Sequence, residues 1–69
     1  MNGHQFIRRA RKWSRANGLA LVIEKGRGKG GHQIVRLENG RWTTVKSGEI
    51  GAGLLNSMFD QLGIAKEDF

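Results

Sequence analysis

Apolar residues recur at helical spacing near the start of the chain. Their spacing of i, i+1, i+4 and i+7 forms one stripe, made of Phe6, Ile7, Ala10 and Trp13. Asn2 is a typical N-cap, and Gln5 three residues later completes the pattern of a capping box. Asn17-Gly18 supplies a stop, because glycine adopts the left-handed conformation without strain. The pattern predicts a helix over residues 3–17.

Alternating apolar and polar positions follow this helix. They predict three strands, at residues 19–24, 32–38 and 41–46. In the first strand Leu19, Leu21 and Ile23 share one face. In the second, Val35 and Leu37 face one way, and the opposite face carries His32, Ile34 and Arg36. The dipeptide Asn39-Gly40 predicts a tight type I′ hairpin between the second and third strands.

A second helix is predicted at residues 52–62, after a glycine-rich connection. Its apolar stripe consists of Leu54, Leu55, Met58 and Leu62. Gly63 ends the helix, and we expect Phe69 to fold back onto the core. The resulting order is helix, three antiparallel strands, helix. We therefore expect an α+β fold in which both helices cover one face of a three-stranded sheet.

The length of 69 residues fits a single domain over residues 1–69 with a thin core. The chain contains no cysteine, which excludes a disulfide framework and a cysteine-ligated zinc. The first apolar run, residues 19–23, is too short to span a bilayer. We expect a protein without membrane association that works in the cytoplasm.

The charge of the chain is unevenly placed. Residues 1–46 hold eleven of the twelve Lys and Arg against only Glu24 and Glu38, a net charge of +9, whereas residues 47–69 carry −3. A basic region of this kind attracts polyanions, of which nucleic acid is the commonest, although a merely solubilising surface is the alternative. The cations of the first helix, Arg8, Arg9 and Lys12 foremost, are candidate RNA contacts, with Arg11 and Arg15 beside them.

A glycine-rich run ends in a histidine. Lys25, Arg27 and Lys29 are candidate phosphate ligands, and Gly30 and Gly31 would let the backbone approach a phosphate closely. The run lacks the Gly-Lys-[Ser/Thr] ending of a P-loop. A solvated hairpin loop is the alternative interpretation.

His32 follows this run at the start of a strand, where we expect it to be partly exposed. Histidine transfers protons near neutral pH, which suits acid–base catalysis on RNA. Taken alone, a residue in this position is more often an ordinary surface histidine of a strand. His4, in the first helix, is a further candidate for proton transfer, with an incidental surface histidine as the alternative.

The layout resembles the double-stranded-RNA-binding-domain fold, and within it the HicA family of mRNA-cleaving toxins from HicA–HicB toxin–antitoxin pairs. The resemblance covers nearly the whole chain. It is carried by Phe6-Ile7-Arg8, the strand Leu19–Glu24, the motif Gly28-Lys29-Gly30-Gly31-His32, and the closing stretch from Gly53 to Phe69. His32 matches the family's catalytic histidine. Where many members have a proline and a second histidine after the third strand, this chain has Val45-Lys46-Ser47.

The resemblance implies a metal-independent ribonuclease without a cofactor. His32 would act as general base on the RNA 2′-hydroxyl or as general acid on the leaving oxygen, and mRNA would be the substrate. It also implies a HicB-like antitoxin and a hetero-oligomer with it. Trp42 is expected to face outward beside Ile34 and Val22, where it would help to bind the antitoxin. The alternatives are Trp42 packed under the hairpin and, for the whole chain, a non-catalytic RNA-binding module or a basic interaction subunit.

Overall fold

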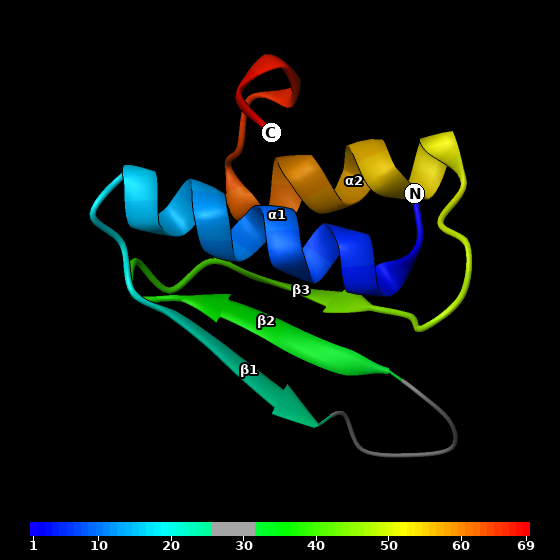
Figure 1. The fold of residues 1–69 in the computed structure, drawn as a ribbon, viewed down its shortest axis with the longest axis horizontal. Coiled ribbons are helices and arrows are strands. Elements are labelled where there is room, and N and C mark those ends of the chain that lie inside the picture. The colour runs from blue at the N-terminus through cyan, green and yellow to red at the C-terminus, as the bar shows by residue number, and fades with distance from the viewer. Residues whose placement is uncertain (26–31) are drawn as a thin grey trace.

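The computed structural model describes residues 1–25 and 32–69. The described elements follow the predicted order (Figure 1), which confirms the α+β fold. They are α1 (Gly3–Ala16), β1 (Leu21–Lys25), β2 (Gln33–Leu37), β3 (Trp42–Val45), α2 (Ala52–Leu62) and a short 3-10 helix, η1 (Lys66–Asp68). In the part of the chain described, no helix is both long and apolar enough to cross a membrane.

The ends of α1 are set by the expected signals. The Asn2 side chain accepts from the Gln5 N–H at 2.9 Å, and the Gln5 side chain accepts from the Asn2 N–H at 3.0 Å, so the capping box is confirmed. Asn17 caps the other end, and Gly18 follows with φ of +67°. The buried face consists of Gly3, Phe6, Ala10 and Ser14.

The predicted first strand begins two residues too early. The N–H of Leu19 donates to the carbonyl of Ser14 at 2.9 Å, which completes the end of α1 instead of a sheet. The N–H of Ala20 donates to the Glu38 carboxylate at 2.9 Å. Both donors are therefore used before pairing starts, and β1 begins at Leu21.

The sheet has the order β1-β2-β3 and is antiparallel throughout. Its register gives two distinct faces. The face toward the helices carries Leu21, Ile23, Val35, Leu37, Thr43 and Val45. The opposite face, here called the outer face, carries Val22, Glu24, Ile34, Arg36, Trp42 and Thr44. In Figure 1 both helices lie on the same side of the sheet, so neither of the helices that the structure describes covers the outer face.

The hairpin between β2 and β3 is not the predicted type I′ turn. That turn needs positive φ at both central residues, and only Gly40, at +92°, has it. The Gly40 N–H instead donates to the Leu37 carbonyl at 3.0 Å, and the Leu37 N–H donates to the Arg41 carbonyl at 2.8 Å. The loop thus has three residues, with glycine in the left-handed position, a common longer hairpin loop. The Asn39 side chain accepts from the Arg41 N–H and holds this shape.

The apolar stripe of α2 is rotated from the predicted one. Met58, Phe59 and Leu62 are buried, whereas Leu54 is 47% exposed, so the predicted stripe is wrong at Leu54 and lacks Phe59. The C-terminal residue does fold back, as predicted. The Phe69 ring lies 4.9 Å from that of Phe6 and 4.8 Å from that of Phe59, which joins α1, α2 and the tail in one aromatic cluster.

Candidate functional site

His32 is exposed and lies directly before β2, at one end of the sheet. The next residue, Gln33, pairs with Lys25 on one side and with Val45 on the other. The pairing of β2 with β3 ends there, and His32 and Lys46 are the next residues along the two segments. Lys25, the last residue of β1, and Lys46, the residue after β3, therefore lie at the same end of the sheet as His32.

The first turn of α1 is held against the segment that follows β3. A β-carbon on Gly3 would lie 2.1 Å from the carbonyl oxygen of Lys46, so the two backbones are in direct contact. The Gly3 N–H donates to the Gly48 carbonyl at 3.2 Å. His4 follows Gly3 and is exposed. The start of α1 thus lies beside the segment that follows β3, and in Figure 1 the start of α1 and the start of β2 are at the same end of the fold.

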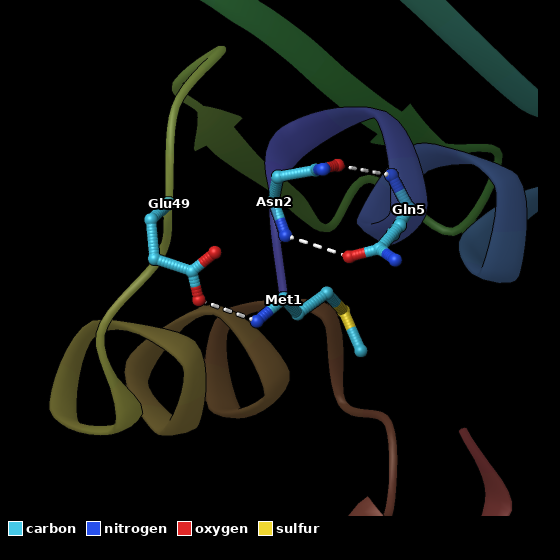
Figure 2. A network of polar contacts seen from close by, with 4 residues as sticks. All are labelled: Met1, Asn2, Gln5 and Glu49. Carbon is cyan, nitrogen blue, oxygen red and sulfur yellow. Dashed lines mark hydrogen bonds and ion pairs between the residues drawn. The ribbon is translucent and has the colours of Figure 1, made fainter.

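A polar network holds the start of α1 against the segment that leads into α2 (Figure 2). The N-terminal ammonium of Met1 lies 2.7 Å from the Glu49 carboxylate, and the Ile50 N–H donates to the Met1 carbonyl at 2.8 Å. Asn2 forms a single β-bridge with Glu49 in addition to its capping bonds. The one acidic side chain near the start of α2 is therefore paired with a cation, which reduces its repulsion of an approaching phosphate.

Two rows of cations run along the exposed surface of α1. Helical spacing aligns Arg8, Arg11 and Arg15 with His4 in one row, and Arg9 with Lys12 in the other. All these side chains are exposed, and within residues 1–25 and 32–69 none of them forms an ion pair. Arg9 and Lys12 line a surface hollow together with Trp13, Asp68 and Phe69. The first row leads to His4 at the start of α1, beside the segment that follows β3. The second row lies next to the acidic C-terminal tail.

Of the predicted phosphate ligands, Lys25 is placed, exposed, at the end of β1. Arg27, Lys29, Gly30 and Gly31 lie outside the described residues. Lys46, half-buried, was not among the candidates. Its position directly after the third strand was the available signal, because antiparallel pairing takes the end of β3 to the start of β2.

Trp42 faces outward as predicted and is 51% exposed, so the alternative of a tryptophan packed under the hairpin is wrong. Across the sheet it aligns with Arg36 and Val22, the latter 53% exposed. Ile34 is half-buried on the same face. Arg36 lies 3.6 Å from the Glu24 carboxylate, so the charges of this face are balanced.

No family model, curated protein or solved structure matches the chain. Among residues 1–25 and 32–69, no group of three His, Cys, Asp or Glu side chains is placed to hold a metal ion.

Proposed function

We propose that the chain is an endoribonuclease of the HicA type that cleaves mRNA without a metal ion, with His32 as general base or general acid. The observation that carries the proposal is the placement of His32. It is exposed directly before β2, and two lysines, Lys25 at the end of β1 and Lys46 directly after β3, lie at the same end of the sheet. An exposed proton carrier among cations suits a reaction at a phosphodiester.

The reaction uses the nucleophile that RNA itself carries. His32 takes the proton of a 2′-hydroxyl, the oxygen attacks the adjacent phosphorus, and the bond to the 5′-oxygen breaks when that oxygen receives a proton. The products are a 2′,3′-cyclic phosphate and a 5′-hydroxyl. Because the nucleophile and the leaving group both belong to the substrate, the protein has to supply only proton transfer, charge stabilisation and positioning.

Charge stabilisation falls to the lysines beside the histidine. The transition state places extra negative charge on the phosphate oxygens, and a fixed cation there lowers the barrier. Lys46 is our candidate for this, since Gln33 and Val45 are the last paired residues of β2 and β3, and His32 and Lys46 are the next residues along the two segments. One histidine cannot be base and acid at the same instant. His4, in the α1 turn that contacts the Lys46 backbone, is our candidate for the second proton carrier.

The cations of α1 bind the substrate. Arg8, Arg9 and Lys12, together with Arg11 and Arg15, form an exposed surface without an acidic residue in the helix. Such a surface neutralises RNA phosphates with little dependence on sequence. The row that contains Arg8 leads toward His4 and the end of the sheet where His32 lies. An RNA strand that lies along this row would therefore extend toward His32.

The proposal includes a partner. A HicB-like antitoxin would cover the outer face around Ile34 and Trp42 and form a hetero-oligomer with the enzyme, since an exposed apolar patch on a small protein favours protein contacts. The mRNA substrate places the activity in the cytoplasm.

The chemistry is tested by the ends of the products. We expect purified protein to leave a 2′,3′-cyclic phosphate and a 5′-hydroxyl, and to leave intact an RNA in which the nucleotide before the cut is 2′-deoxy. Products with a 5′-phosphate, or cleavage of the deoxy-substituted RNA, would contradict the mechanism. RNA binding without any cleavage would favour a non-catalytic RNA-binding module, for which the cations of α1 are sufficient.

A further inference from the structure

A groove runs along the free edge of the sheet, between β3 and α2. One wall is formed by the residues from Gly40 to Thr44, and the other by Leu54, Ser57 and Gln61. These three residues lie at i, i+3 and i+7, so they form a single line along α2. The groove is open to solvent and has a volume of about 530 Å³. Its floor is fixed by the buried Thr43 hydroxyl, which donates to the Gln61 side chain.

The sheet wall of this groove is a row of main-chain hydrogen-bonding groups. β3 pairs with β2 on one side only, which makes it an edge strand. Within the part of the chain that the structure describes, no hydrogen bond joins the outward side of Trp42–Val45 to another segment's backbone. An edge of this kind pairs readily with an additional extended chain.

The side chains around the edge define what that chain must be. Trp42 is 51% exposed and Leu54 is 47% exposed, one on each wall, and both offer apolar surface. Among the lining residues within 1–25 and 32–69, Arg41 is the only charged one, and its guanidinium group lies beside Gly63. A nucleic acid needs several cations, and those are on α1 instead. A second copy of the chain would bring together two molecules of net charge +6.

We propose that this groove binds an extended, acidic segment of a partner protein, which adds to β3 as a fourth strand. Its backbone pairs with Trp42–Val45, its apolar side chains lie against Trp42 and Leu54, and a carboxylate meets Arg41. The inference depends on the edge strand, the groove and its charge, and on no part of the nuclease proposal.

The test uses the full chain and a blocked peptide of alternating valine and threonine with glutamate at both ends. In an NMR titration we expect the amide signals of residues 42–45 and 54–61 to shift, and the outward amides of β3 to exchange more slowly with solvent. Leu54→Glu should weaken binding by about tenfold or more, because it replaces apolar contact with repulsion. Val22→Glu is the matched control, equally exposed on β1 at the other edge of the sheet, and should leave the affinity unchanged.

Two further comparisons test the binding mode. Arg41→Glu should weaken binding of the peptide with glutamate at its ends and strengthen binding of a peptide with lysine at its ends. A backbone N-methylated peptide, which cannot complete the ladder, should not bind. The proposal is overturned if residues 42–45 do not respond to the peptide, if Val22→Glu weakens binding as much as Leu54→Glu, or if N-methylation has no effect. If a single-stranded RNA displaces the peptide, the groove is a nucleic-acid site and the proposal is wrong. If the chain forms a dimer that Leu54→Glu dissociates, the groove binds a second copy of the chain instead.

Discussion

Gly3 lies so close to Lys46 that a β-carbon on the glycine would stand 2.1 Å from the lysine's carbonyl oxygen. The contact joins the first turn of α1 to the chain just after β3. It therefore sets the distance between the cation-bearing helix and the end of the sheet where His32 lies. Glycine is required here because the helix has to approach another backbone, which no side chain would permit.

The substitution Gly3→Ala tests this contact. Overpacking against a backbone carbonyl should lower the free energy of unfolding by about 1–3 kcal/mol, measured by urea denaturation. The matched control is Gly53→Ala in α2, where a β-carbon meets nothing within 4 Å. That change should raise the free energy of unfolding by about 0.5–1 kcal/mol. Equal effects of the two substitutions would show that the contact at Gly3 is absent.

Lys46 should matter for the rate of cleavage more than for folding. Lys46→Ala removes the cation directly after β3, at the end of the sheet where His32 lies, and we expect kcat to fall by about tenfold to a hundredfold while KM changes little. Lys46→Arg should recover most of the activity, since it keeps the charge. Lys66→Ala, an exposed lysine on η1, serves as control. An unchanged kcat in a folded Lys46→Ala protein would remove Lys46 from the mechanism.

The two cation rows of α1 should differ in their contribution to RNA binding. Each of Arg8, Arg11 and Arg15 changed to Gln should reduce the slope of log affinity against log salt by about 0.7, the value for one phosphate contact on a single strand. Arg9→Gln and Lys12→Gln should reduce it less, because Asp68 shares their hollow. The measurement is a filter-binding titration at several salt concentrations. A slope that neither set alters would show that RNA does not lie along α1.

The aromatic cluster should depend on the last residue of the chain. Phe69→Ala removes ring contacts with both Phe6 and Phe59 and should lower the free energy of unfolding by about 1–3 kcal/mol. Asp68→Ala, at the exposed neighbouring position, should change it by less than about 0.5 kcal/mol. If thermal unfolding of the two variants is indistinguishable, the tail contributes no stability.

The order of elements was predictable because the local signals are strong. The capping box of Asn2 and Gln5 and the alternation of Val35 and Leu37 each act over a few residues, and both are observed. The hairpin was mispredicted because Asn39-Gly40 is compatible with two loop lengths. The choice depends on where the pairing of β2 and β3 ends, and here Leu37 pairs with Arg41.

Long-range arrangements were less accessible from the sequence. Leu54 and Phe59 both fit an apolar helical stripe, and only the position of α2 against Phe6 and Phe69 decides which of them is buried. The same holds for the candidate site. His32 was identified from its place after the glycine run, whereas Lys46 emerged from strand register, which brings together residues that are far apart in the chain.

The central claim is that His32 transfers a proton in metal-independent cleavage of RNA. The direct measurement is the single-turnover cleavage rate of an mRNA in excess EDTA, for the unaltered protein and for His32→Ala, with folding of both checked by circular dichroism. We predict that EDTA leaves the unaltered protein active and that His32→Ala lowers the rate by about 10²–10⁴-fold without weakening RNA binding comparably. Cleavage that EDTA abolishes, or that His32→Ala retains in full, would contradict the claim.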